Sequence, residues 1–192
     1  MLVWNHLERM KVIDVANICS WDETSAGAKV GRSDGRLLIN EWRIGDCTYS
    51  AIAAMTNLGF YPVVDINDVA CTSETICTFL RRLKPFLTPE TTGLFDNPTV
   101  NACDDTLRMV DEVFDGNWKR NAPYSPRLQP IEGGFSLVRQ NWKEASISRS
   151  NAERVLRNAF AYYSIGGLGG HVCISFFNIY RDWNNADNDN NI

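Results

Sequence analysis

The sequence predicts an α+β protein that combines a helical subdomain with a small, mostly antiparallel sheet. Four segments carry apolar residues at helical spacing, about three short segments have the composition of strands, and the strongest strand pattern lies near the C-terminal end. The chain has 192 residues, of which 44% are hydrophobic and 22% charged, as in ordinary globular domains. We therefore expect one globular domain over residues 1–183 and a polar C-terminal tail over residues 184–192, where Asn and Asp dominate.

The first predicted helix covers residues 47–58. Cys47, Ala51 and Ala54 fall on one face of that helix, and the glycine that follows the segment is a natural stop signal. Residues 25–34, which precede it, are small, polar and glycine-rich, so they have the composition of a loop.

Three more helices are predicted from apolar faces with start or stop signals. One begins at Ser73, a residue type that caps helices, and another covers residues 104–114, where a glycine closes the pattern. The last begins at a capping box formed by Ser150 and Glu153 and reaches Tyr163.

The remaining segments predict a loop and strands. Residues 117–134 contain three prolines and a glycine pair, which indicates a long ordered loop. Residues 135–138 have the composition of a strand, and residues 37–39 are either a short strand or an anchoring apolar run. Residues 171–180 are apolar on both faces, which is typical of a central strand that is covered on both sides.

The composition excludes membrane proteins and secreted proteins. No run of 18 apolar residues occurs, and the N-terminal residues lack the unbroken apolar stretch of a secretory signal. We therefore expect a soluble protein, cytoplasmic or virion-associated, with no membrane partner. The six cysteines are then expected to be reduced.

The net charge and the spacing of possible metal ligands also limit which partners and cofactors are expected. The net charge is −4, and the basic runs at residues 81–84 and 119–120 are short enough to be solvated helix edges or loops, so we expect no nucleic-acid partner. No C-x-x-C or H-x-x-x-H spacing occurs, and His6 and His171 are the only histidines. We expect neither a metal site nor a cofactor.

Adjacent carboxylates occur at residues 104–105 and 111–112 within a predicted helix. Neighbouring side chains on a helix point in diverging directions and do not face one site. The first pair instead suits the first turn of a helix, where the helix dipole favours negative charge. We assign neither pair a catalytic role.

A thiol and an imidazole form the best candidate for catalysis. Cys47 lies at the predicted start of a helix, where exposed N–H groups lower the pKa of a thiol. His171 begins the strongest predicted strand, and Asp182, or alternatively Asn178 or Asn184, could orient its ring. The alternative is that Cys47 is a small buried apolar residue and that His171 is a hydrogen-bonded strand terminus.

The segment at residues 45–54, GDCTYSAIAA, resembles the nucleophile helix of papain-like cysteine peptidases. Residues 64–71 are similar to the segment that follows this helix, and residues 121–124 resemble the family's Tyr-Pro-Tyr turn. Residues 155–179 look like the helix, glycine-rich turn and strand that come next. The resemblance implies a papain-like fold.

The resemblance also implies a substrate cleft, in which the oxyanion-hole position differs from that of the family. Gly45, Gly169 and Gly170 would line this cleft, together with Glu41, which stands where the family has its oxyanion-hole Gln. A carboxylate there would repel the developing oxyanion. Either the family's catalytic His corresponds to a position beyond the last residue, or His171 fills that role.

Two functions remain open. The first is a non-catalytic or degenerate papain-like protein, such as a viral or structural component, that acts in binding or assembly. The second is a thiol hydrolase that cleaves a peptide or amide bond, with Cys47 as nucleophile and His171 as base. The replacement at Glu41 favours the first. Both functions imply a protein or peptide partner, and a second copy of the chain is a further candidate.

Overall fold

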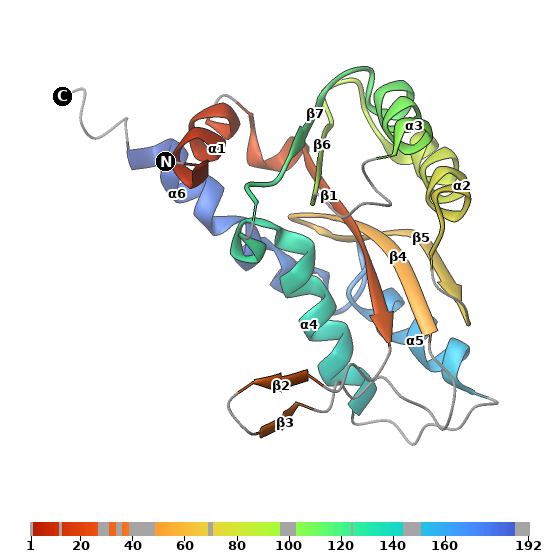
Figure 1. The fold of residues 1–192 in the computed structure, drawn as a ribbon. Coiled ribbons are helices and arrows are strands. Elements are labelled where there is room, and N and C mark those ends of the chain that lie inside the picture. The colour runs from red at the N-terminus through yellow and green to blue at the C-terminus, as the bar shows by residue number, and fades with distance from the viewer. Residues whose placement is uncertain are drawn as a thin grey trace.

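A computed structural model describes residues 2–11, 13–26, 31–33, 36–38, 49–68, 71–96, 103–123, 125–143 and 151–186 (Figure 1). The helices are α1 (Leu2–Met10), α2 (Ser73–Leu83), α3 (Asp104–Phe114), α4 (Pro130–Lys143), α5 (Ala152–Tyr162) and α6 (Asn178–Ala186). The strands are β1 (Ile18–Ala26), β2 (Gly31–Ser33), β3 (Arg36–Leu38), β4 (Tyr49–Thr56), β5 (Gly59–Asn67), β6 (Thr92–Phe95) and β7 (Trp118–Arg120). Short 3₁₀ helices are η1 (Val15–Asn17), η2 (Lys84–Phe86), η3 (Pro126–Leu128) and η4 (Gly170–Phe177).

The central sheet has five strands in the order β5-β4-β1-β6-β7. Strands β5, β4 and β1 pair antiparallel, whereas β1, β6 and β7 pair parallel. The prediction of an α+β protein is confirmed, but the sheet is mixed and not mostly antiparallel. A second small sheet pairs β2 with β3.

Helices cover both faces of the central sheet (Figure 1). On one face, α2 and α3 pack against a cluster that includes Trp21, Ile52 and Phe95. On the other face, α4, α5 and η4 enclose a cluster that includes Phe60 and Phe135. Alternate residues of each central strand therefore enter two separate cores, because successive side chains of a strand point to opposite faces.

Three of the four predicted helices are confirmed. Helix α2 begins after Thr72, whose hydroxyl accepts the Thr75 N–H in a capping box, one residue before the predicted cap. Helix α3 has the predicted bounds, and α5 follows Asn151 where Ser150 was expected as the cap. Strong apolar faces marked these helices correctly.

The predicted helix over residues 47–58 is wrong in the described part of that segment. Residues 49–67 form the β4–β5 hairpin, and Asn57 and Leu58 make its turn. Strand β4 is buried on both faces, so its apolar residues do not alternate with polar ones. A short apolar run of this kind fits a helical face as well as a central strand.

The expected loop to residue 134 and the strand over residues 135–138 are replaced by α4. Ile131, Phe135 and Val138 lie fully buried at helical spacing, and Pro130 occupies the first turn, where proline is favoured. A Cβ on Gly134 would lie 2.7 Å from the Met55 sulfur. The glycines that indicated a loop instead let α4 approach the sheet closely.

The predicted strand over residues 171–180 is also wrong, because this segment forms η4 and the start of α6. Cys173 and Phe177 are buried at a spacing of four residues, whereas Val172 and Ile174 are exposed. The glycine run before it makes a tight turn in which a Cβ on Gly170 would lie 2.5 Å from the Ser164 carbonyl oxygen.

Helices α1 and α6 pack together at one side of the molecule (Figure 1). The rings of Trp4 and Trp183 meet edge to face, with their centroids 4.8 Å apart. Helix α6 runs to Ala186, through the first residues of the segment expected as a tail, and residues 187–192 lie outside the described part. No described helix is long and apolar enough to cross a bilayer.

Candidate functional site: a carboxylate cluster on the central sheet

Asp22 lies in the middle of β1, the central strand of the sheet. It pairs with Ala53 of β4, which belongs to the core beneath α4, so the Asp22 side chain faces α4. Only 6% of Asp22 is exposed. Ser20 and Thr24 share this face by alternation, and β1 therefore presents a polar stripe to α4.

Asp96 directly follows β6, the strand that runs parallel to β1. The parallel ladder pairs Ile18 with Thr92 and Ser20 with Leu94. The same register, continued by two residues, sets Asp96 level with Asp22 and on the same face of the sheet. Two carboxylates far apart in sequence thus become neighbours.

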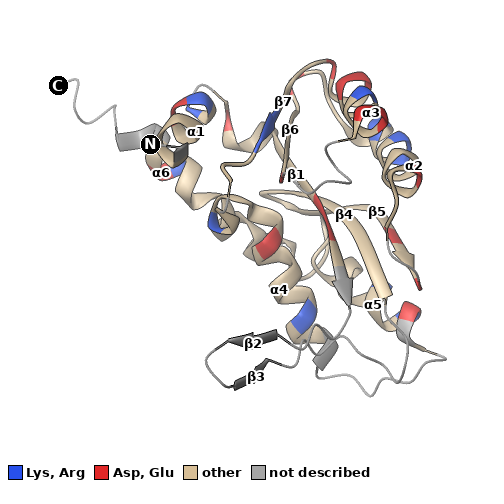
Figure 2. Ribbon diagram, in the orientation of Figure 1, with Lys and Arg blue, Asp and Glu red and all other residues tan. Residues whose placement is uncertain are grey.

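Glu132 comes from the first turn of α4, which packs across the carboxylate face of β1. The Ile131 N–H donates to the Ser20 hydroxyl at 3.4 Å, and Arg139 donates from Nη2 to the Thr24 hydroxyl at 3.0 Å. These two contacts hold α4 along the polar stripe. Figure 2 shows acidic positions on β1 and on the first half of α4 beside it.

The three carboxylates interact electrostatically. Burial raises the pKa of Asp22 to about 8, and the negative charges of Glu132, Asp96 and Glu23 add to the rise, although the Glu23 N–H opposes it. Burial raises the pKa of Glu132 as well. The positive charge of Arg139 lowers this pKa, whereas the negative charge of Asp96 adds to the rise. Mutual perturbation of this kind is typical of functional sites.

Both oxygens of Asp22 accept a hydrogen bond. The Glu23 N–H donates to Oδ1 at 2.7 Å, and the Gln129 side chain donates from Nε2 to Oδ2 at 2.8 Å. Gln129 comes from the loop between η3 and α4 and is only 2% exposed. Its Oε1 accepts from Asn121 Nδ2 at 3.3 Å, so a buried chain of amides leads to Asp22.

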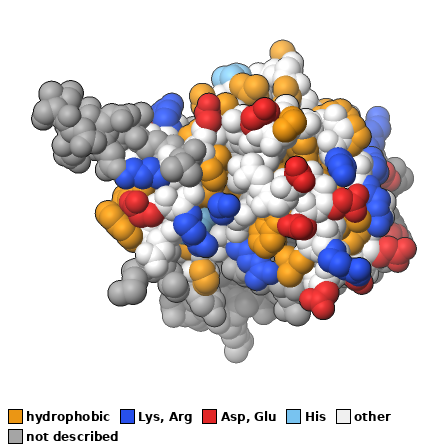
Figure 3. Space-filling view, turned by 90° about the horizontal axis from the view of Figure 1, so that it is seen from above, with side chains coloured by type: hydrophobic (Ala, Val, Ile, Leu, Met, Phe, Trp, Pro, Cys, Tyr) orange, Lys and Arg blue, Asp and Glu red, His pale blue; other side chains and the backbone are white. Residues whose placement is uncertain are grey.

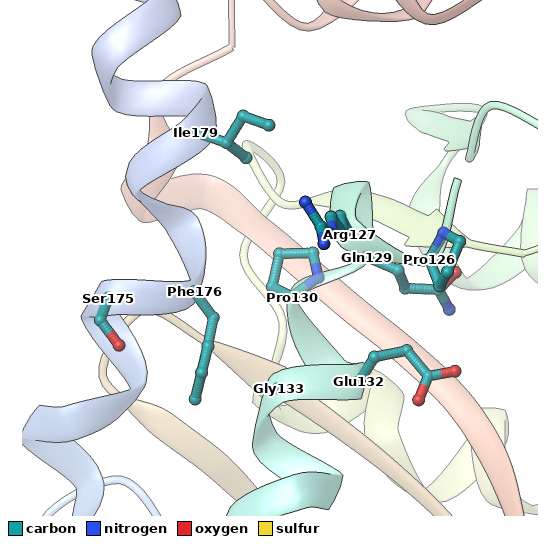
Figure 4. A pocket seen from close by; sticks show the side chains of 9 residues that line it. All are labelled: Pro126, Arg127, Gln129, Pro130, Glu132, Gly133, Ser175, Phe176 and Ile179. Atoms are coloured by element: carbon teal, nitrogen blue, oxygen red, sulfur yellow. The ribbon is translucent and has the colours of Figure 1, made fainter.

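A pocket of about 450 Å³ lies on another side of the first turn of α4 (Figure 4). Phe176 and Ile179 from η4 and α6 line it on one side, and Arg127 and Pro130 line it on the other. Figure 4 shows that the Glu132 carboxylate points away from Phe176. The apolar part of this pocket is therefore separate from the carboxylate cluster.

The donor set of the cluster is the one that hard divalent cations prefer, because Mg²⁺ and Mn²⁺ bind carboxylate oxygens. Among the described residues, no three His, Cys, Asp or Glu side chains are close enough to hold a metal ion in this arrangement. The electrostatic coupling nevertheless places Asp22, Asp96 and Glu132 near one another. The three carboxylates fit a divalent cation by the chemistry of their donor atoms.

The residues of the predicted thiol site are only partly described. Cys47, Glu41 and Gly45 lie outside the described residues, so their predicted roles are not tested. His171 is an exposed residue of η4 and does not open a strand, and Asp182 is exposed on α6.

Gly169 lies in the turn before η4 and Gly170 is the first residue of η4, and the lack of a side chain at both allows close packing. A Cβ on Gly169 would lie 2.5 Å from the Tyr162 ring, and one on Gly170 would lie 2.7 Å from the Leu58 carbonyl oxygen. Whether either glycine contacts a substrate stays a prediction.

The carboxylate cluster was missed because only adjacent carboxylates were considered in the sequence. A usable signal was present at Asp96, which ends the apolar run Gly93–Phe95, as residues at the end of a buried strand often serve a site. Asp22 and Glu132 have no such local signal, because their proximity depends on the strand order and on α4.

The comparisons with known proteins report similarity of fold. No family model and no curated protein matches the sequence. The structure is similar to the crystal structure of the catalytic domain of Mos1 mariner transposase, with a TM-score of 0.66, 15% sequence identity, and coverage of 95% of this chain and 86% of that chain. It is also similar to the Mos1 catalytic domain solved with raltegravir and Mg, with a TM-score of 0.61, 16% identity, and coverage of 97% and 91%.

A longer Mos1 chain shows the same likeness. For the Mos1 transposase paired-end complex with the left transposon end, the TM-score is 0.63 and the identity 14%, over 97% of this chain and 60% of that one. This chain therefore spans about six-tenths of that transposase.

These neighbours correct four predictions. The papain-like fold is wrong, and with it the interpretations as a degenerate papain-like binding or structural protein and as a thiol hydrolase. The expectation of no nucleic-acid partner is contradicted as well, because neighbours of the same fold were solved as complexes with transposon ends. The α+β architecture, with its five-stranded mixed sheet flanked by helices, is similar in fold to the Mos1 transposase catalytic domain.

Proposed function

We propose that this chain catalyses divalent-cation-dependent phosphoryl transfer on DNA, cutting or joining strands as a transposase does. The observation that carries the proposal is the convergence of Asp22, Asp96 and Glu132, from β1, the end of β6 and α4, on one face of the sheet. The likeness of the whole fold to a transposase catalytic domain supports the same function.

Asp22, Asp96 and Glu132 would hold the cation through their carboxylate oxygens. When bound, Mg²⁺ or Mn²⁺ polarises a phosphate group and lowers the pKa of an attacking water or hydroxyl. Neighbours of this fold were solved with Mn and with Mg. Burial and the neighbouring carboxylates raise the pKa of Asp22 and Glu132, and positive charge at the cluster would relieve the repulsion between the carboxylates.

Basic side chains beside the cluster support an anionic substrate. Lys119 of β7 pairs with Leu94, whose side chain lies in the core on the carboxylate face, so alternation places Lys119 on that face at the sheet edge. Arg127 of η3 and Glu132 both line the pocket of Figure 4, where the Glu132 carboxylate points away from Phe176. Figure 3 shows Lys and Arg side chains at several places on one face of the molecule, interspersed with Asp and Glu, and the net charge is −4.

Nicking of supercoiled plasmid DNA in the presence of Mn²⁺ tests the proposal without knowledge of a specific DNA sequence. We expect the wild-type chain to nick the plasmid and EDTA to stop the reaction. Asp22→Asn, Asp96→Asn and Glu132→Gln should each reduce nicking to background, because each removes a cation ligand. Glu90→Gln, which changes an exposed carboxylate in the turn before β6, is the matched control and should remain active.

Two results would overturn the proposal. One is a wild-type chain that neither binds Mn²⁺ in calorimetry nor nicks the plasmid. The other is nicking that survives all three substitutions in folded protein, since the reaction would then occur elsewhere.

A further inference from the structure

We infer that Gln129 is a positioning residue that holds the Asp22 carboxylate in place for a cation, and that Asn121 sets the orientation of Gln129. The inference deepens the proposed function and rests on the cation site at Asp22. Neither amide would touch the cation or the DNA in this scheme, since both act through Asp22.

Gln129 leaves Asp22 able to bind a cation while it restrains the carboxylate. Each carboxylate oxygen has two lone pairs. Asp22 Oδ1 uses one for the Glu23 N–H, and Oδ2 uses one for Gln129 Nε2 at 2.8 Å. Two donors on different oxygens fix the plane of the group, and each oxygen keeps a lone pair for a ligand.

Backbone groups decide which end of Gln129 faces Asp22. The Ala122 N–H can only donate, and it donates to Asn121 Oδ1 at 2.8 Å. Asn121 Nδ2 is therefore directed to the Ser125 carbonyl oxygen at 3.0 Å and to Gln129 Oε1 at 3.3 Å. Because Oε1 accepts there, the donor Nε2 of Gln129 must face Asp22.

Hydrogen bonds fix the backbone around Gln129. Tyr180 of α6 donates its hydroxyl to the carbonyl of Leu128, the neighbouring residue, and the Gln129 N–H donates to the Pro126 carbonyl oxygen at 3.0 Å. The Asn121 N–H continues the β7 ladder to the Phe95 carbonyl oxygen at 2.8 Å. Both amides thus project from fixed backbone, which a positioning role requires.

Mn²⁺ affinity measured by calorimetry tests Gln129. Gln129→Met keeps the length of the side chain but removes the donor, and we expect Mn²⁺ affinity to fall about 10- to 100-fold, the usual cost of removing a residue that orients a metal ligand. Gln140→Met is the matched control, since Gln140 is exposed on α4, the helix that begins directly after Gln129, and its Mn²⁺ affinity should equal that of the wild type.

Asn121→Asp tests the orientation. The new carboxylate accepts the Ala122 N–H as before but repels Gln129 Oε1, so the Gln129 amide should rotate and turn its oxygen towards Asp22. We expect weaker Mn²⁺ binding, although simple attraction by an added negative charge predicts the reverse. In a Gln129→Met background, where no amide remains to rotate, Asn121→Asp should cause no further loss.

A measurement on the wild-type chain covers the case in which a variant fails to fold. Mg²⁺ titration should shift the NMR signals of the Gln129 side-chain amide and leave those of Gln140 unchanged. The inference is overturned if the wild type binds the cation and nicks DNA while folded Gln129→Met does both equally well, or if the Gln129 signals do not move. Absence of Mn²⁺ binding and of nicking in the wild type would overturn the proposed function, and this inference with it.

Discussion

Asp22 shows the cost in stability of burying a carboxyl group beside other carboxylates. Its carboxyl group is nearly fully buried beside other carboxylates, and its pKa is raised to about 8. The folded chain therefore binds a proton at Asp22 more tightly than the unfolded chain, whose Asp titrates near pH 4. The contribution of Asp22 to the free energy of unfolding is largest below about pH 4 and is lost as the pH rises to about 8.

Asp22→Asn should remove this pH dependence. We expect the variant to exceed the wild type by about 1 to 3 kcal/mol in the free energy of unfolding at pH 9, because a buried charge is lost, and to differ little at pH 4. Urea denaturation at the two pH values measures this. Glu90→Gln serves as the control, and an equal effect of Asp22→Asn at both pH values would contradict the raised pKa.

The thiols differ in their expected reactivity. Hydrogen bonds from Thr106 lower the pKa of Cys103, whose sulfur lies 3.1 Å from the Thr106 hydroxyl, whereas burial raises the pKa of Cys71 to about 12 and that of Cys173 to about 11. Cys103 should therefore react first with iodoacetamide among these three, because the thiolate is the reactive form.

Thr106→Val should slow the alkylation of Cys103 several times, since it removes the hydroxyl that stabilises the thiolate. Peptide mapping of the labelled protein over time gives the rates, with Cys71 and Cys173 as internal references. Thr78→Val, at an exposed position of α2, is the matched control. An unchanged Cys103 rate would show that the hydroxyl does not set its reactivity.

At the scale of elements, close approach of α4 to the sheet places Glu132 opposite Asp22. Gly134 allows this approach, because a Cβ there would lie 2.7 Å from both the Met55 sulfur and the tip of the Phe60 ring. Gly134→Ala should reduce the free energy of unfolding by about 1 to 2 kcal/mol, even though alanine favours a helix. Urea denaturation tests this, with Ser136→Ala on the exposed side of α4 as control. Stabilisation by Gly134→Ala would show that α4 can move away without cost.

Element types were predictable where one side of a segment faces water. Helices α2 and α3 show apolar residues at helical spacing against polar ones, and both were located correctly. The spacing of apolar residues did not identify strand β4 or 3₁₀ helix η4. Every residue of β4 after the first is buried, and η4 has apolar residues on its exposed side as well, so neither carries a readable period.

At the scale of the whole molecule, the two ends of the described chain support the loop that carries Gln129. Tyr180 of α6 donates to the Leu128 carbonyl oxygen and contacts His6 Nε2 of α1 at 3.0 Å. Because the Tyr180 hydroxyl has one proton, His6 is the donor in the second bond. Burial, with Arg9 nearby, lowers the pKa of His6 to about 4, which keeps its ring neutral at pH 7.

Tyr180→Phe should break this connection. We expect a loss of about 1 to 3 kcal/mol in the free energy of unfolding, because buried partners at His6 and Leu128 are left without their bonds. Hydrogen exchange should also become faster in α1. Tyr162→Phe, at an exposed ring on α5, is the control for both measurements. Unchanged exchange in α1 would mean that packing alone holds the two ends together.

The candidate site could be predicted only in part, for reasons that apply to the whole fold. The local signal at Asp96, a carboxylate after an apolar run, was within reach of sequence reasoning. Asp22 and Asp96 become neighbours only because β6 pairs parallel to β1, and Glu132 joins them only because α4 crosses that face. Strand order depends on which buried faces fit together, and a linear pattern does not record it.

The amino-acid sequence by itself determined that the chain folds as an α+β domain, and it located the helices α2, α3 and α5. Amphipathic spacing and capping are local properties, so they can be recognised from neighbouring residues. Only the tertiary structure decided the β4–β5 hairpin, the order of the mixed sheet and the meeting of three carboxylates with a buried amide. These features arise from packing between distant segments, where burial on both faces removes the periodic signal and long-range pairing sets which side chains meet.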